Sequence, residues 1–412
     1  MKFKRAIDPL LQQQLTKPGG IFLMGPRQVG KTTLILDVIG EKPFWHIRLQ
    51  EYGLFQSYLK DPGLFKRQAL LKLSGASPKK PLILFLDEAQ KLPGILDDCQ
   101  WILDEHKEKV RIFITGSSAR KLRRHSTNLL PGRVNMKNLS PLLWQEISGH
   151  KHSQHIFDFS GTGKNMTVTW PFPWEDIFIY GSLPGILTLP EKERTQMLSS
   201  YALGYLKEEI QAEALTRSLD GFSRFLELAA LESGQTTNFQ KLSREVGLSL
   251  NTIKTYYLLL IDTLVAIALP AYSRNTRKKV TTTSKIYFFD VGVRNAAAEL
   301  PISKDLLKVD PGKLFEHGIV LEFLRRIDYF SPTTKAYFWR DDSGAEVDFL
   351  IDTKEKLIPI EIKWTSKTTN LKLKGLKKFM SEYNVPIGYV IGNFPQAEQI
   401  EKNIIALPWW SV

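Results

Sequence analysis

The chain has 412 residues, of which 43% are hydrophobic and 24% are charged, the composition of an ordinary globular protein. At roughly 150 residues per domain, this length predicts two to four domains. The longest apolar stretch, around Leu264 to Leu269, is too short to span a bilayer, so we expect no membrane segment. The single cysteine, Cys99, excludes an internal disulfide and a cysteine-rich zinc site.

The charge balance bears on partners and location. The formal net charge of +13 favours an anionic macromolecular partner, but it does not distinguish nucleic acid from an anionic membrane surface. The first residues, Met1 to Arg5, are basic, yet no long apolar segment follows them, so we expect no signal peptide. Because cysteine is so rare, a reduced, cytoplasmic setting fits best.

A phosphate-binding motif follows the apolar run of residues 21–24. The run predicts a short buried strand, and residues 33–39 predict the first turns of a helix. A glycine, four residues and Gly-Lys-Thr make up the motif, and its nucleotide-binding residues are Gly25, Pro26, Arg27, Gln28, Val29, Gly30, Lys31, Thr32 and Thr33. Its backbone N–H groups are expected to form an anion nest at the helix N-terminus. Lys31 is predicted to reach the β- and γ-phosphates, and Thr32 to ligate magnesium.

Two acids end a later predicted strand. Residues 44–49 predict the second strand and residues 81–88 the third, which ends in Asp87 and Glu88. Asp87 is predicted to hold the magnesium ion, and Glu88 to activate the attacking water as general base. The alternative is a buried strand with a charged exit. We favour the catalytic interpretation, because the acids follow the phosphate loop in the expected order.

The strand predicted at residues 110–115 runs into Gly116, Ser117 and Ser118. A polar side chain at this strand tip is suited to orient the hydrolytic water, and both serines are candidates. A basic run at residues 120–125 follows, and then Arg133. In oligomeric ATPases an arginine placed here reaches the γ-phosphate of the neighbouring subunit. We favour Arg133 over the basic run for that role. The alternative for these arginines is a solvated face or a nucleic-acid contact.

Strands that alternate with helical stretches predict a parallel sheet with helices on both faces and the nucleotide at the carboxyl ends of the strands. The segments Gly-Pro-Arg-Gln-Val-Gly-Lys-Thr-Thr, Leu-Phe-Leu-Asp-Glu-Ala-Gln, Ile-Thr-Gly-Ser-Ser and Leu-Pro-Gly-Arg occur in this order. They resemble the AAA-type P-loop ATPases of bacteria and archaea that carry a C-terminal domain of unknown function with a restriction-endonuclease-like core. The resemblance implies an α/β P-loop NTPase core at residues 1–145 and a ring or other homo-oligomer driven by nucleotide.

Residues 146–215 predict a linker and a helical lid. Between Gly149 and Pro173 periodicity is lost and three histidines occur, His150, His152 and His155. No cysteine or paired carboxylate lies nearby at the spacing of a tetrahedral site, so we favour a surface linker or insertion over a metal site. The turn at residues 180–185 is interpreted as structural.

Residues 216–295 predict a winged-helix module. Residues 237–240 look like a capping box that opens a short helix, and Ser249, after the Gly247 turn, is predicted to cap a second helix. Strands near residues 264–269 and 285–289 flank a basic wing, whose candidate DNA contacts are Arg274, Arg277, Lys278 and Lys279. A cationic wing suits phosphates. The alternative is a protein–protein platform, and we favour nucleic acid.

Residues 296–412 predict an α/β restriction-endonuclease-like domain. Strands at 345–351 and 357–363 are predicted to form a hairpin that sets Asp348 opposite Glu361, with Lys363 on the same face. A helix beginning at Gly312 can bring Glu316 to them. In such nucleases the carboxylates bind magnesium and the lysine steadies the attacking water or the phosphate. A charged solvent face has the same spacing, but the resemblance extends to Gly-Lys-Leu-Phe-Glu, Ala-Glu-Val-Asp-Phe and Pro-Ile-Glu-Ile-Lys in this segment.

Together these features predict an ATPase with ATP and Mg²⁺ as cofactors that acts on nucleic acid, DNA in particular, as a homo-oligomer. Two alternatives stay open. One is a nucleotide-switched regulator that docks a protein partner, and the other is a nuclease gated by ATP.

Overall fold

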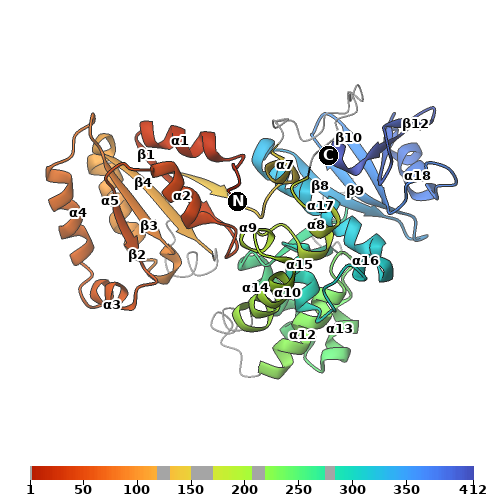
Figure 1. The fold of residues 1–412 in the computed structure, drawn as a ribbon, viewed down its shortest axis with the longest axis horizontal. Helices are drawn as coiled ribbons and strands as arrows, with labels where there is room; N and C mark the ends of the chain where they lie inside the picture. Colours follow the sequence, from red (N-terminus) through yellow and green to blue (C-terminus); the bar gives the residue numbers. More distant parts are fainter. Residues whose placement is uncertain (1, 118–129, 150–169, 207–218, 274–283) are drawn as a thin grey trace. The chain divides into compact units, whose positions relative to one another are not determined.

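The computed structural model describes residues 2–117, 130–149, 170–206, 219–273 and 284–412. Figure 1 traces the chain from its N-terminus to its C-terminus. The chain divides into two compact units. The first, which we call the N-terminal unit, is Lys2–Ser140 with Asp262–Val265, and the second, the C-terminal unit, is Pro141–Ile261 with Ala266–Val412.

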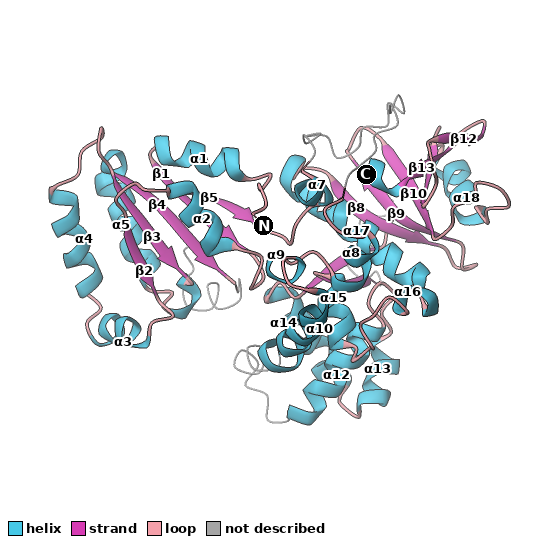
Figure 2. Ribbon diagram, in the orientation of Figure 1, coloured by secondary structure: helices cyan, strands magenta, loops and turns pink. Residues whose placement is uncertain are grey.

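The N-terminal unit is built on a five-stranded, wholly parallel sheet of strand order β2-β3-β4-β1-β5 (Figure 2). Its strands are β1 (Gly19–Met24), β2 (Trp45–Arg48), β3 (Leu82–Asp87), β4 (Val110–Gly116) and β5 (Val134–Asn138). Its helices are α1 (Asp8–Thr16), α2 (Lys31–Ile39), α3 (Tyr52–Lys60), α4 (Leu64–Ser74) and α5 (Ile95–His106), with short 3-10 turns η1 (Ala89–Lys91) and η2 (Lys107–Lys109).

Both faces of this sheet are covered. One face packs against α3, α4 and α5 in a cluster that includes Leu84, Ile112 and, from α4, Phe65. Alternate strand residues such as Phe85 and Phe113 point to the opposite face and are also fully buried, on the side where α1 and α2 pack together. A parallel sheet buried on both sides needs near-continuous apolar strands, and β1 and β4 are buried at every position. The predicted α/β architecture of the core is confirmed.

The C-terminal unit begins with helices. They are α7 (Trp144–Ser148), α8 (Glu175–Tyr180), α9 (Pro184–Leu187), α10 (Glu191–Ser199), a π-helical segment η3 (Ser200–Leu206), α12 (Leu219–Leu231), α13 (Phe239–Val246) and α14 (Leu250–Asp262). The two-stranded antiparallel sheet β6 (Ala266–Pro270) and β7 (Ser284–Phe288) follows, and then α15 (Val291–Ala297), α16 (Leu306–Val309) and α17 (Pro311–Phe330). Among the helices of the described residues, none has both the length and the apolar character needed to cross a membrane.

The helix–turn–helix pair α13 and α14 forms as the sequence predicts, with one correction. The N-cap of α13 is Asn238, whose side chain accepts a hydrogen bond from the Lys241 amide at 3.0 Å, and not Thr237. Asparagine and threonine both cap helices well, so two adjacent cap residues leave the first turn ambiguous by one residue. Gly247 takes the left-handed conformation that ends α13 (φ +76°), and Ser249 accepts from the Thr252 amide at the start of α14.

A six-stranded mixed sheet closes the chain, with strand order β12-β13-β11-β10-β9-β8. Its elements are β8 (Lys335–Arg340), β9 (Glu346–Asp352), β10 (Leu357–Lys363), α18 (Lys374–Tyr383), β11 (Gly388–Gly392), β12 (Glu398–Glu401), β13 (Ile404–Pro408) and the 3-10 turn η5 (Trp409–Ser411). One face packs on α18, where Leu350 meets Phe379, and the other on α17, where Phe323 stacks on Phe349.

A buried polar network ties α17 to the start of the C-terminal unit. Arg325 donates to Ser182 Oγ at 2.7 Å and to two backbone carbonyls. Glu322, also fully buried, accepts from the Trp144 amide at 3.2 Å. Burial raises the pKa of Glu322 to about 7, although Arg326 and Arg325 lower it in part. This helix is therefore fixed by charged groups as well as by apolar packing.

Candidate functional site

The phosphate loop connects β1 to α2, as predicted. Gly25 has no room for a side chain, because a Cβ there would lie 2.3 Å from the Leu139 carbonyl oxygen. Gly30 has φ +94°, a backbone conformation that side chains disfavour. Arg5 supports the loop from outside by donating to the Val29 carbonyl at 2.9 Å and the Ser140 carbonyl at 2.6 Å. No sequence pattern indicated this role for Arg5, which lies twenty residues before the motif.

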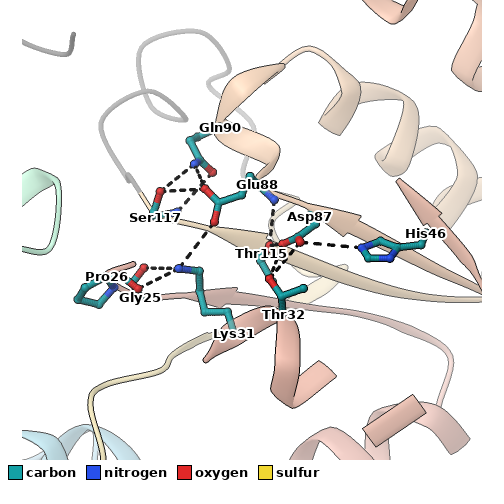
Figure 3. Close-up of polar contacts among 10 residues, drawn as sticks. All are labelled: Gly25, Pro26, Lys31, Thr32, His46, Asp87, Glu88, Gln90, Thr115 and Ser117. Atoms are coloured by element: carbon teal, nitrogen blue, oxygen red, sulfur yellow. Dashed lines mark hydrogen bonds and ion pairs between the residues drawn. The ribbon is translucent and has the colours of Figure 1, made fainter. Parts of the chain in front are cut away.

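Lys31 folds back over the loop that precedes it. Its ammonium donates to the carbonyls of Gly25 at 2.8 Å and Pro26 at 2.9 Å (Figure 3). It also lies 3.8 Å from Glu88 Oε1, and its side chain is 4% exposed. The charge is therefore held within the loop, beside the carboxylate that was predicted to be the general base.

Asp87 ends β3 and meets the loop threonine. Thr32 Oγ1 lies 3.1 Å and 3.0 Å from the two carboxylate oxygens, and Thr115, at the end of β4, donates to Oδ1. The residues predicted to hold magnesium are thus brought together. A hydroxyl and a carboxylate are the hard oxygen donors that Mg²⁺ prefers, so the donor set fits that ion.

Glu88 has an unusual backbone and a tightly held side chain. Its φ of +59° is left-handed, and its N–H donates to Thr115 Oγ1 at 2.9 Å. Its carboxylate Oε2 accepts from Ser117 Oγ at 3.0 Å and from the Gln90 amide (Figure 3). Gln90 Nε2 also donates to Ser117 Oγ at 2.8 Å. Ser117 therefore orients Glu88, and sequence reasoning missed its partner Gln90.

His46 on β2 is a second residue that sequence reasoning missed. Its ring stacks on Phe85 with centroids 4.5 Å apart, and Nε2 lies 3.9 Å from Asp87 Oδ2. Arg48 Nε lies 3.3 Å from Nδ1 and donates to it, which places the proton on Nε2, facing Asp87. Burial and the nearby Arg48 charge lower the pKa of His46, so the ring is neutral at pH 7.

Arg133 lies at the amino ends of the parallel strands, whereas the phosphate loop lies at their carboxyl ends. It precedes β5, whose first residue, Val134, pairs with Gly20 at the start of β1, whereas the loop follows the end of β1. Its guanidinium pairs with Asp104 on α5, with Nη2 at 3.0 Å from Oδ2. Within one subunit Arg133 is therefore remote from the phosphates. Its role as an arginine finger stays a prediction, and only for a neighbouring subunit.

Several predicted residues lie outside the part of the chain that the structure describes. They are Ser118, the basic run at 120–125, the histidines His150, His152 and His155, and the wing residues Arg274, Arg277, Lys278 and Lys279.

The C-terminal carboxylates meet as the predicted hairpin requires. Ile360 pairs with Phe349 in the antiparallel β9–β10 ladder, and the same register continued by one pair sets Glu361 opposite Asp348. Lys363 lies 2.6 Å from Glu361 Oε1 and 4.0 Å from Asp348 Oδ2. Burial and the facing carboxylate raise the pKa of Asp348, and burial also raises that of Glu361.

Glu316 on α17 pairs with side chains of a strand that lies outside the predicted domain of residues 296–412. Lys285 on β7 lies 3.1 Å from Glu316 Oε1 and 2.6 Å from Glu346 Oε1, with its side chain 4% exposed. Tyr287 donates to the same Glu316 oxygen at 3.0 Å. These carboxylates raise the pKa of Lys285 although burial opposes them, so it is charged. Sequence reasoning missed both β7 residues.

The fit of a magnesium ion to this carboxylate cluster is partial. Glu361 Oε2 is buried and accepts no hydrogen bond from the described residues, as expected of an oxygen that awaits a cation. Glu316 Oε1 already accepts hydrogen bonds from the Lys285 ammonium and the Tyr287 hydroxyl. Across the described ranges, no group of three or more His, Cys, Asp or Glu side chains is arranged to hold a metal ion. Asp348 and Glu361 fit the ion, and Glu316 does not.

Comparisons with known proteins define the class of the N-terminal unit. Residues 17–148 match the family model described as an AAA domain. With its phosphate loop and parallel sheet, this unit is a P-loop ATPase domain. Residues 172–304 and 311–412 match two models, each described as a domain of unknown function.

Relatives are similar over most of the chain. Two uncharacterized proteins, one of Mycobacterium bovis and one of Mycobacterium tuberculosis, are each 24% identical over 359 residues, 86% of this chain and 73% of theirs. A Walker-type ATPase of Pyrococcus abyssi has a similar solved structure, with a TM-score of 0.48 at 16% identity, over 72% of this chain and 96% of that one. A signal transduction ATPase of Pyrococcus horikoshii with a tetratricopeptide repeat sensor has a TM-score of 0.30 at 13% identity, over 80% and 48%.

Proposed function

We propose that the protein is a magnesium-dependent ATPase that acts as a homo-oligomer on nucleic acid. One observation carries the ATPase part of the proposal. In a domain that matches the AAA model, the Asp87 carboxylate accepts a hydrogen bond from the hydroxyl of the loop residue Thr32, and the Glu88 carboxylate lies beside the Lys31 ammonium.

Each of these residues has a role that its position supports. Lys31 would neutralise charge on the β- and γ-phosphates, and Thr32 and Asp87 would hold a magnesium ion, which would supply further positive charge to the phosphate oxygens. Glu88 Oε1 takes a proton from a water molecule as the water oxygen attacks the γ-phosphorus. The bond to the β-phosphate oxygen breaks, and ADP leaves with that electron pair.

The nucleic-acid part of the proposal rests on the C-terminal unit and on charge. We interpret α13, the turn at Gly247, α14 and the β6–β7 hairpin as a winged helix. The net charge of +13 favours binding to phosphates. A cation-rich surface that binds phosphates releases counterions, so its affinity falls steeply with salt.

The test is ATP turnover with and without DNA, combined with DNA binding across a salt series. Turnover is expected to rise with DNA, and binding to weaken as salt increases. Glu88→Gln is the matched control, because it should bind nucleotide and DNA but hydrolyse little ATP. A wild-type protein whose turnover ignores DNA, and whose binding is absent at every salt concentration, would contradict the nucleic-acid proposal and leave the ATPase proposal standing.

A second candidate function is a metal-dependent nuclease in the C-terminal unit. The facing pair Asp348 and Glu361, with Lys363 at 2.6 Å from Glu361, supports it. Asp348→Ala is expected to abolish magnesium-dependent DNA cleavage and leave ATP turnover intact. Cleavage that survives this substitution would assign the nuclease activity elsewhere or to a contaminant.

A further inference from the structure

The ammonium of Lys285 sits among carboxylates that come from two other elements. Glu316 belongs to α17 and Glu346 to β9, and both contact the lysine, at 3.1 Å and 2.6 Å. The ring of Phe338 lies 5.5 Å from the ammonium. A lysine buried this deeply is stable only when paired, and here two carboxylates share it.

The carboxylates of Glu316 and Glu361 differ in how many hydrogen bonds and ion pairs their oxygens receive. Glu316 Oε1 receives both Lys285 and the Tyr287 hydroxyl. Glu361 receives Lys363 on one oxygen, while its other oxygen is buried without a hydrogen bond among the described residues. A pocket of about 360 Å³ opens onto Lys285, Glu316 and Glu346, so small ions can enter from solvent.

We infer that Lys285 is the resident cation of this carboxylate cluster, and that a divalent metal ion gains Glu316 as a ligand only when Lys285 is withdrawn. The inference rests on the second candidate function, in which Asp348 and Glu361 bind the metal. It adds control, because Lys285 belongs to the β6–β7 hairpin, the element interpreted as the wing. Movement of the hairpin would therefore change metal loading at a site on another sheet.

Electrostatics give the direction of the effect. Glu316, Glu346, Asp348 and Glu361 face the ammonium groups of Lys285 and Lys363, and Glu346 also pairs with the Arg340 guanidinium at 3.6 Å. A further cation placed among them is repelled by these cationic side chains. Removing the Lys285 charge leaves Glu316 without an ion pair among the described residues and leaves Glu346 with Arg340 alone, at 3.6 Å, and a divalent ion then becomes the better counter-charge. We expect affinity for the ion to rise by about tenfold or more, since one close charge contact of ~1.4 kcal/mol already corresponds to that factor.

Mn²⁺ binding, measured by electron paramagnetic resonance on nucleotide-free protein, tests the inference. Every sample carries Asp87→Asn, which removes the metal ligand proposed for the N-terminal unit. Lys285→Met removes the charge, and Lys285→Arg keeps it. Lys308→Met is the matched control, because Lys308 is 79% exposed and pairs only with Asp305 among the contacts described. Lys285→Met combined with Asp348→Asn shows whether any new site uses the predicted ligand.

We expect Lys285→Met to bind Mn²⁺ at least tenfold more tightly than the parent, and the Asp348→Asn combination to lose that gain. Lys285→Arg and Lys308→Met should bind like the parent. Equal binding by the parent and Lys285→Met, or a gain that survives Asp348→Asn, overturns the inference. If Lys285→Met is isolated unfolded, Mn²⁺ should restore folding, and failure to do so also overturns it.

The nuclease proposal fails separately. DNA cleavage that is absent from every variant, together with the gain in Mn²⁺ affinity, would remove the nuclease and keep the resident lysine. If cleavage depends on Asp348 but not on Lys285, and Mn²⁺ affinity is unchanged in Lys285→Met, the nuclease proposal stands and the inference about Lys285 is removed.

Discussion

Replacing Gln90 with alanine removes the amide that holds the proposed general base. Gln90 donates to Glu88 Oε2 and to Ser117 Oγ, and its own oxygen accepts from the Ser117 amide at 3.3 Å. Because Oε2 is occupied by these donors, Oε1 is the oxygen left for a water molecule, on the side of Lys31. The amide thus decides which carboxylate oxygen faces the phosphate loop.

The size of the effect follows from the bond that is lost. A hydrogen bond to a charged group contributes about 1.5–3 kcal/mol, and each 1.4 kcal/mol is a factor of ten in rate, so kcat should fall roughly ten- to a hundredfold. KM for ATP should change little, because the hydrogen bonds described for Gln90 go to Glu88 and Ser117 and so act on the proposed base. Ser117→Ala should give a similar loss. The double variant should lose less than the product of the two, because both side chains bind the same oxygen.

Steady-state ATP hydrolysis with a phosphate-release assay measures both constants. Gln12→Ala, an exposed glutamine on α1, is the matched control and should be indistinguishable from the wild type. Thermal unfolding of each variant shows whether the fold persists. A Gln90→Ala protein with wild-type kcat, or one in which KM rises and kcat does not fall, would refute the reasoning.

Three further predictions concern other residues. If Arg133 acts across a subunit boundary, Arg133→Ala and Lys31→Ala should each be inactive alone but recover part of the ATPase rate when the two variants are mixed. No recovery would contradict the role of Arg133 as an arginine finger. His46→Phe keeps the stacking on Phe85 but loses the N–H that faces Asp87, so the Mg²⁺ concentration for half-maximal turnover should rise about tenfold, as for other groups that orient a metal ligand; an unchanged Mg²⁺ titration would show that His46 only packs. Burial raises the pKa of Glu322 to about 7 from an ordinary value of 4.5, so the folded state binds an extra proton between those pH values and loses stability as pH rises through them. Glu322→Gln should therefore gain about 3 kcal/mol relative to the wild type between pH 4 and pH 8 in denaturant unfolding, and parallel pH curves for the two proteins would contradict this.

The local motifs were predictable because their chemistry is encoded in short stretches. The glycines, Lys31 and Thr32 form one loop, and a buried strand that ends in Asp87 and Glu88 needs no long-range information. The register of Asp348 and Glu361 was also predictable, since a tight turn between two alternating strands fixes which residues face each other. In both cases the residues that act together are close in sequence or joined by one turn.

The supporting residues were not predictable for the opposite reason. Gln90 meets Ser117 from 27 positions away, and Lys285 meets Glu316 from 31 positions away, through packing that no local pattern records. A polar side chain after a strand, or a lysine in a hairpin, is ordinarily solvated. Arg133 shows the same limit, because its motif did not reveal that it lies at the amino ends of the strands, away from the phosphate loop.

Thr115 joins the two acids through a single atom. Its hydroxyl oxygen donates its one hydrogen to Asp87 and accepts the N–H of Glu88, so the hydroxyl cannot turn without losing one of them. That N–H belongs to a residue held at φ +59°, a conformation that persists only when its surroundings enforce it. Ser117, two residues further along the chain and one residue beyond the end of β4, holds the Glu88 side chain. The end of β4 therefore sets both the backbone and the carboxylate of the proposed base, and through Asp87 it links the base to the metal ligand. A shift of this strand end would disturb the proposed metal ligand and the proposed base together.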